Sequence, residues 1–371
     1  MMETNQPKAR VWAYYLPQFH PIPENDEWCG KGFTEWTNVG KAKPLFPGHY
    51  QPHVPADLGY YDLRVPETRE AQAQMAREAG VEGFVYWHYW FGNGKRLLER
   101  PFNEVLASGK PDFPFALAWA NQTWEGFAFG ADESRPPLIE QTFLGDDDYI
   151  AHFNAILPAF KDPRYMTCKG KPIFIIYNTN TIPDLKHYIT LWNDLAIQNG
   201  LKGLSFIAHK QSLMSSGAVE GYLNRMKENG FSAINVVNRF RIFDPQFTFC
   251  ERLVRKIFHR WLKIFPEIYK YDIEVMHTML DDREDVIPTV TPNWDHTPRS
   301  GRHGVVLVGS TPELFGKAMH NAIQSVKGKP YDKRIIRIKS WNEWAEGNYL
   351  EPDMKYGHQY LDALKNEVLS S

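Results

Sequence analysis

Two glutamates stand three residues apart near the C-terminal end of the sequence, within the stretch KSWNEWAEGN at positions 339–348. Cleavage of a glycosidic bond requires one carboxyl group that protonates the leaving oxygen and a second carboxylate that assists from nearby. Aromatic side chains can hold a sugar, because their faces pack against the apolar surfaces of sugar rings. Candidates for sugar contact beside the pair are Trp341, Asn342 and Trp344. Glu343 and Glu346 are therefore predicted to be the catalytic residues of a carbohydrate-active enzyme.

The alternative for this glutamate pair is a solvated helix surface, where such spacing is common. Two tryptophans, an asparagine and a glycine argue against it, because exposed helices favour Lys, Arg and Ala. The preceding residues 335–338 alternate as a strand does. The pair would then follow the carboxyl end of a strand, where barrel enzymes carry their catalytic groups.

Composition limits the classes of partner. The chain has 371 residues, 43% of them hydrophobic, and a formal net charge of -2, which does not suit a nucleic-acid partner. Cys29, Cys168 and Cys250 lie far apart, without the spacing of a disulfide framework or a zinc site. We predict no metal and no cofactor. The 14% aromatic content, with many rings at predicted strand ends, indicates a lined cleft for an oligo- or polysaccharide.

The N-terminus lacks the apolar segment of a signal peptide, and the sequence shows no run long enough to span a membrane. A cytoplasmic location is expected. Residues 249–265 predict a helix with one basic and one apolar face, which is typical of an outer barrel helix. Peripheral contact with an anionic membrane is the alternative for this helix.

Strand and helix patterns alternate about eight times along the chain, which is typical of an α/β fold of the (β/α)8 (TIM) barrel type. A doubly wound sheet would normally show a glycine-rich turn after the first strand, and Tyr15-Leu16-Pro17-Gln18 is not one. We predict one catalytic domain over residues 1–371, with an insertion at about 17–65. The predicted strands are 10–16, 83–89, 115–120, 172–177, 204–208, 232–235, 286–290 and 335–340. The predicted helices are 66–79, 97–107, 146–160, one ending near 200, 218–229, 246–265, 311–326 and 357–369.

In such a barrel, the loops after the strands share one mouth. Side chains near these strand ends are therefore predicted to bind substrate: Tyr14, Tyr15, Tyr86, Trp87, His88, Trp119, Asn121, Tyr177 and Trp294. Glu35 and Trp36 join them, because they lie in a loop too long to be a simple connection. For Tyr14, Trp119 and Tyr177 the alternative is that they fill the top of the barrel. His88 could equally be a core imidazole, because it, Tyr86 and Trp87 cannot all point inward.

Asp146, Asp147 and Asp148 superficially offer the Asp-x-Asp motif of metal-dependent sugar-nucleotide transferases. Carboxylates in the first turn of a helix also meet its positive dipole. We favour this second interpretation, since the sequence shows no glycine-rich phosphate loop.

With these residues in view, nearly the whole chain resembles the WbsX-type glycosyltransferases of O-antigen loci, which are related to glycoside hydrolase family 99. The resemblance rests on AYYLPQFH at 13–20, GFTEW at 32–36, residues 83–90, WAN at 119–121 and above all WNEWAEG at 341–347. In the hydrolases the last motif reads Asn-Glu-Trp-His-Glu-Gly. The resemblance implies that Glu343 assists the sugar 2-hydroxyl in a retaining mechanism through an anhydro-sugar, and that Glu346 is general acid and then base. Ala345 stands where those relatives have His, which weakens the inference that this chain shares their α-mannan substrate.

These observations predict an enzyme that cleaves or transglycosylates a glycosidic bond in a polysaccharide, such as an O-antigen or another bacterial surface glycan. A WbsX-type glycosyltransferase of polysaccharide biosynthesis is the first alternative. A non-catalytic glycan-binding barrel is the second. The spacing leaves the stereochemistry open: a helical turn would bring the two carboxyls close enough for retention, whereas an extended segment would part them.

Overall fold

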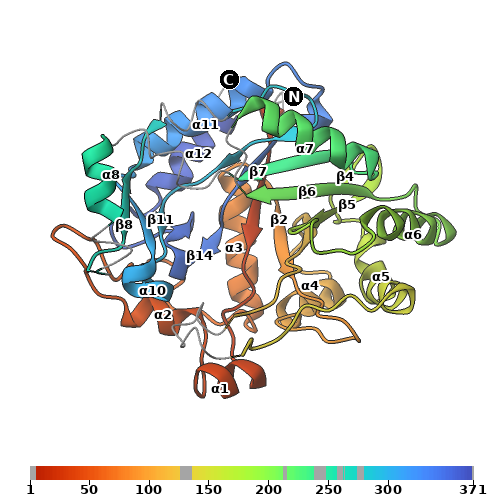
Figure 1. The fold of residues 1–371 in the computed structure, drawn as a ribbon, viewed down its shortest axis with the longest axis horizontal. Helices are drawn as coiled ribbons and strands as arrows, with labels where there is room; N and C mark the ends of the chain where they lie inside the picture. The colour runs from red at the N-terminus through yellow and green to blue at the C-terminus, as the bar shows by residue number, and fades with distance from the viewer. Residues whose placement is uncertain are drawn as a thin grey trace.

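A closed barrel of parallel strands organises the chain (Figure 1). The computed structural model describes residues 6–125, 136–211, 215–237, 248–256, 262, 264–273 and 280–369. In barrel order the strands are β1 (Arg10–Tyr15), β2 (Val81–His88), β3 (Phe115–Trp119), β5 (Lys171–Ile176), β6 (Ser205–Gln211), β7 (Ala233–Val237), β9 (Val286–Ile287), β10 (Thr289–Val290) and β13 (Ile335–Ile338). β9 pairs with β7, β10 pairs with β13, and β13 pairs with β1, all in parallel.

Residues 286–290 close the barrel as one interrupted strand. Pro288 separates β9 from β10, because proline has no N–H to donate to the ladder. The carbonyl of Pro288 still accepts a hydrogen bond from the backbone N–H of Arg337 at 2.9 Å. With 286–290 counted once, the described residues give the eight strands of the predicted (β/α)8 barrel, which is confirmed.

Helices cover the outside of the barrel. They are α3 (Pro66–Glu78), α4 (Arg100–Ser108), α5 (Asp146–Phe160), α6 (Leu185–Gln198), α7 (Ser216–Glu228), α11 (Pro312–Val326) and α12 (Gln359–Leu369). Side chains of Asp184, Ser215 and Thr311 cap three of them. Asp146, Asp147 and Asp148 form the first turn of α5, as predicted. The two chain ends lie near each other, and the backbone N–H of Lys8 donates to the carbonyl of Val368 at 3.0 Å (Figure 1).

The predicted helix over 246–265 is shorter than expected. The structure shows α8 (Phe249–Lys256), but Leu262, Ile264 and Phe265 are not helical, and residues 257–261 and 263 lie outside the described part. Pro266 disfavours a helical conformation at Phe265, and β8 (Glu267–Lys270) begins at once. Leu253 and Val254 of α8 are exposed rather than packed against a barrel. Membrane contact by this segment stays a prediction, and no helix among the described residues has the length and apolarity to span a bilayer.

The sequence did not predict a small second sheet beside the barrel mouth. It consists of β8, β12 (Val305–Val308) and β11 (Trp294–Asp295). Three short helices also occupy the long loops: α1 (Pro23–Cys29) and α2 (Glu35–Lys41) in the insertion after β1, and α10 (Thr297–Ser300) after β11. α10 and α2 lie against each other in Figure 1 and carry the charged residues described next.

Candidate active site

The glutamate motif folds as a tight hairpin, neither a helix nor an extended strand. β14 (Asn342–Glu343) pairs antiparallel with β15 (Asn348–Tyr349), and a 3-10 turn, η6 (Trp344–Glu346), joins them. Gly347 follows with φ +57°, and a Cβ there would lie 2.6 Å from the backbone nitrogen of Asp295. Only glycine fits this position, because a side chain would be both strained and blocked.

Contacts on both sides fix the hairpin. The Asn342 amide accepts from the N–H of Leu16 at 2.7 Å and donates to its carbonyl at 3.0 Å, which ties the hairpin to the end of β1. Trp344 stacks on Tyr349 with ring centroids 3.8 Å apart and donates to the buried carboxylate of Glu351 at 2.6 Å. The two glutamates are therefore held on a rigid element.

A cavity of about 310 Å³ opens at the carboxyl ends of the strands, and we call it the central pocket. Its size is within the range of small-molecule sites, and its position is that of active sites in barrel enzymes. It is lined by Leu16, Gln18, Trp87, Tyr89, Ala120, Gln122, Thr123, Trp124, Glu125, Tyr177, Arg299, Lys339, Glu343 and Glu346. Both predicted catalytic residues thus face one ring-lined cavity.

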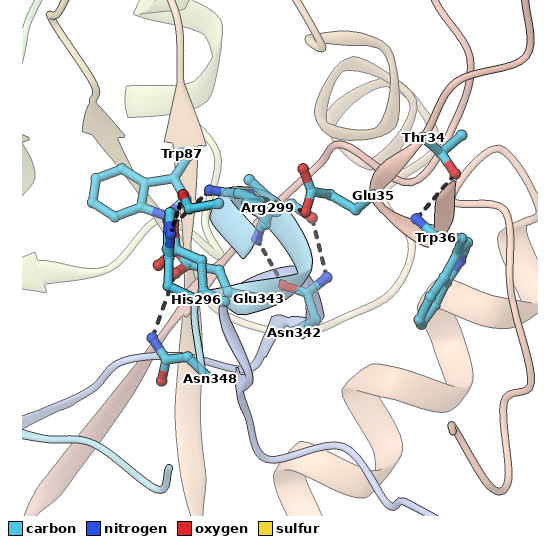
Figure 2. A network of polar contacts seen from close by, with 12 residues as sticks. Thr34, Glu35, Trp36, Trp87, His296, Arg299, Asn342, Glu343 and Asn348 are labelled. Carbon is cyan, nitrogen blue, oxygen red and sulfur yellow. Dashed lines mark hydrogen bonds and ion pairs between the residues drawn. The ribbon is translucent and has the colours of Figure 1, made fainter. Parts of the chain in front are cut away.

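Glu343 lies deep in the central pocket. Trp87 donates its indole N–H to one carboxyl oxygen at 2.7 Å, and the Asn348 amide approaches the other at 3.5 Å (Figure 2). Lys339 Nζ lies 3.5 Å from that second oxygen. Burial raises the pKa of Glu343 to about 7 despite Lys339, and the neighbouring Glu346 adds to the rise. Glu343 is therefore suited to hold a proton near neutral pH.

Glu346 is held in the opposite charge state. Burial would raise its pKa, but Lys339 at 3.4 Å and the guanidinium of Arg299 hold that pKa well below the usual range. His296 Nε2 lies 3.8 Å from the Glu346 oxygen that Arg299 contacts. One ammonium thus contacts a proton-holding carboxyl and an ionised carboxylate, which is the combination that acid-assisted bond cleavage needs.

A buried carboxylate stands behind Arg299. Glu35, at the start of α2, has no exposed surface and accepts from Arg299 Nε at 3.2 Å and Nη2 at 3.1 Å (Figure 2). Burial raises the pKa of Glu35, and Arg299 opposes that rise. Arg299 therefore bridges Glu35 and Glu346, and the structure places Glu35 behind Arg299, outside the residues that line the central pocket.

Of the predicted ring residues, Trp87 and Tyr177 line the central pocket. Tyr14 lies beneath them in the barrel: its ring stacks on Trp87 with centroids 4.5 Å apart, and its hydroxyl donates to Asn235 at 2.9 Å. Tyr14 therefore fills the barrel, which was one of the two interpretations left open, and supports Trp87 from below.

Four other predicted residues face the outer helices, because neighbouring strand residues point to opposite sides. Their partners are Gln72 for Tyr15, Phe102 for Tyr86, His152 for His88 and Tyr188 for Trp119. Trp341 is also buried away from the pocket, with its ring 5.1 Å from that of Phe84. The structure does not bring these five residues to the central pocket.

The remaining predicted residues shape the loops. Asn121 bonds the backbone of Asn178, and Trp36 donates to the carbonyl of Tyr61 at 2.7 Å and packs beside Trp344. Asn342 and Trp344 hold the hairpin, as described above. Trp294 lies under Lys339, whose Nζ is 4.6 Å from the ring centroid, and lines an adjacent hollow.

His88 and His152 predict acid sensitivity. Their Nε2 atoms lie 2.8 Å apart in full burial, and desolvation lowers the pKa of both well below the usual value. Unfolding restores pKa values near 6.5, so the unfolded chain binds more protons, and stability should fall as the pH drops below about 6.5. Urea midpoints at pH 7.5 and 5.0 measure this fall. In His152→Phe the loss of stability between pH 7.5 and 5.0 should be smaller than in the parent. An equal loss would show that the histidine pair is not its cause.

Sequence reasoning missed the cations. Lys339 lies inside the glutamate motif, and a basic residue four positions before Glu343 at a strand end was an available signal. No sequence signal pointed to Arg299, because the β11–α10 segment that presents it was not predicted. Among the described residues, His, Cys, Asp and Glu form no group of three or more that could hold a metal ion.

Solved structures share the fold. A glycoside hydrolase-like protein gives a TM-score of 0.62 at 15% identity, over 100% of this chain and 96% of that one. The endo-alpha-mannosidase of glycoside hydrolase family 99 from Bacteroides thetaiotaomicron gives 0.56 at 16% identity, over 96% of this chain and 95% of that one. At such identities the similarity concerns the fold alone.

Sequence relatives are longer than this chain. WxcX from two strains of Xanthomonas campestris pv. campestris is 35% identical over 363 residues, which cover 97% of this chain and 50% of the relative. The chain thus spans about half the length of these curated relatives. Residues 11–364 match the family described as glycosyltransferase WbsX. The chain therefore belongs to the WbsX family, as the resemblance implied.

Proposed function

We propose that this chain is a carbohydrate-active enzyme that cleaves or transglycosylates a glycosidic bond in a polysaccharide. The observation that carries the proposal is the carboxyl pair. Glu343 and Glu346 face one ring-lined cavity, contact the same ammonium, and differ in charge state near neutral pH. Solved structures that share this fold and are named as glycoside hydrolase or glycoside hydrolase-like proteins support the proposal, but the main evidence is the carboxyl pair.

In the proposed reaction, Glu343 donates its proton to the leaving oxygen as the bond to the anomeric carbon breaks. Glu346, kept ionised by Lys339 and Arg299, faces the positive charge that develops at that carbon. Glu346 then bonds to that carbon. In the second step the oxygen of water or of a sugar hydroxyl displaces Glu346, and Glu343, now ionised, takes the proton of that acceptor. This assignment reverses the roles implied by the resemblance. One oxygen of each carboxyl lies within 3.5 Å of Lys339 Nζ, so these oxygens are at most about 7 Å apart, and the two side chains hydrogen-bond each other. Such close spacing is nearer to that of retaining sites than to that of inverting sites.

The rate should fall at alkaline pH. If Glu343 must be protonated, kcat/KM should decrease tenfold per pH unit above about 7, because burial raises its pKa to that value in the free protein. Burial also raises the pKa of Glu351 to about 7, but that group lies outside the pocket. Glu351→Gln is therefore the matched control and should keep the alkaline limb. A profile flat to pH 9 would remove Glu343 from the acid role.

The direct test is a screen of bacterial surface polysaccharides and defined oligosaccharides for cleavage, with the product anomer followed by NMR. Release of a product that keeps its anomeric configuration is the expected result. An inverted product would exclude the retaining arrangement, and cleavage of no glycan would count against the proposal as a whole.

A glycosyltransferase that uses a sugar nucleotide is the second candidate, favoured by the name of the family. It needs a site for a nucleotide diphosphate. Calorimetry with UDP, GDP, ADP and CDP distinguishes the two: we expect no binding at micromolar concentration, and micromolar binding of any of them would favour transfer from a nucleotide donor.

A further inference from the structure

A second cavity, of about 130 Å³, lies on the other side of the glutamate hairpin, and we call it the side hollow. Its wall combines the insertion after β1, the β11–β12 sheet and the segment after the hairpin. Tyr and Trp side chains form part of the lining: Tyr50, Trp294, Tyr349, Tyr356 and Tyr360. Side chains with both a flat apolar face and a polar tip are well suited to a sugar.

One thin wall separates the side hollow from the central pocket. Gly347 lines the side hollow and follows Glu346 directly, packed tightly against the backbone of Asp295. Trp294 also lines the side hollow, while Lys339, which contacts both glutamates, lies over its ring. The side hollow therefore begins one residue away from the proposed catalytic carboxylates.

Polar groups in the side hollow are held in place before any ligand binds. The Tyr349 hydroxyl donates to Asp353 at 2.7 Å, and Asp353 accepts the backbone N–H groups of Lys355 and Tyr356 at 3.0 and 2.7 Å. Lys355 Nζ lies 4.6 and 4.7 Å from the ring centroids of Tyr50 and Tyr356. Within the described part of the chain, no carboxylate is within 4.0 Å of this ammonium. Lys355 is exposed, so its N–H donors are open to water or to a sugar oxygen.

We propose that the side hollow is a second saccharide site, which binds another sugar unit of the polymer that is cleaved in the central pocket. Tyr50 and Tyr356 pack against the sugar, and the Lys355 ammonium, which lies over both rings, donates to its oxygens. This inference rests on the proposed function. A third cavity, lined by residues such as Asp282, Gln324 and Lys329, offers a contrast: no aromatic side chain of the described residues lines it, so stacking cannot occur there.

Chain length provides the test. A polysaccharide that the protein cleaves is reduced to oligosaccharides of two and of six sugar units, and KM and kcat are measured for both. Tyr50→Ala and Tyr356→Ala should each raise KM for the longer substrate at least fivefold, leave kcat unchanged, and leave both constants unchanged for the shorter one. Tyr60→Ala, an exposed tyrosine outside both cavities, is the matched control and should behave as the parent.

Parent-like constants for both variants on both substrates would overturn the second site while leaving the proposed function intact. If the parent cleaves nothing, Glu343→Gln is tested for binding to immobilised bacterial O-polysaccharides, with and without Tyr356→Ala. Binding that Tyr356→Ala weakens supports the site even though the proposed function has failed. Binding that the substitution does not change, or no binding at all, overturns it. Thermal melting of each variant identifies loss of folding.

Discussion

Glu343→Gln and Glu346→Gln should each lower turnover about 10³-fold or more while leaving substrate binding within a few-fold of the parent. Glutamine preserves the shape of each side chain but can neither donate the acid proton nor carry the negative charge. Turnover on the best substrate from the screen, together with calorimetric binding, measures both effects. Glu140→Gln, at an exposed position outside the central pocket, is the matched control and should be fully active.

Chemical rescue separates the two roles. Loss of an acid matters little when the leaving group needs no protonation, so Glu343→Gln should recover on a dinitrophenyl glycoside of the same sugar. Glu346→Gln should not recover in that way, but azide should restore turnover by replacing the missing negative charge. The opposite pattern would return the acid role to Glu346, as the family resemblance implies. Full turnover by both variants would remove both glutamates from the catalytic roles. Glycan binding without any turnover by the parent would support a glycan-binding barrel without catalysis.

Arg299→Met should destabilise the fold by about 3 kcal/mol at pH 8, since it leaves a buried carboxylate without its cation. Glu35 has no exposed surface, and Arg299 is its ion-pair partner among the described residues, with Nη2 at 3.1 Å. In the variant, Glu35 keeps a folded-state pKa above its unfolded value. Its protonated form is tolerated, so the destabilisation should shrink as the pH falls toward 5 and grow as it rises. Urea unfolding across this pH range measures the effect.

Two further variants test the cause. Glu35→Gln added to Arg299→Met should recover part of the lost stability at pH 8, because the unpaired charge is gone. Arg302→Met, at an exposed position in the turn after α10, should change stability by less than about 0.5 kcal/mol. If the double variant is no more stable than Arg299→Met, Glu35 is not the charge that Arg299 neutralises.

The sequence by itself determined the barrel and the place of its catalytic candidates. Alternation in runs such as 335–338 predicts strands, and glycines after helices, such as Gly80 and Gly109, predict where helices end. Because strand carboxyl ends meet at one mouth, the position of Glu343 and Glu346 after the last strand was enough to place them in a shared cavity.

Only the tertiary structure decided which neighbours reach that cavity and what charge each carboxyl holds. Tyr14 and Trp87 point into the barrel, whereas Tyr15, Tyr86 and His88 point to the outer helices. Successive side chains of a strand alternate between the two faces, but the sequence does not say which set faces inward. The charge states follow from the approach of Arg299 and Lys339 to Glu346 and from the burial of Glu343. Such effects depend on distances between groups brought together from separate loops, and these distances exist only in the folded chain.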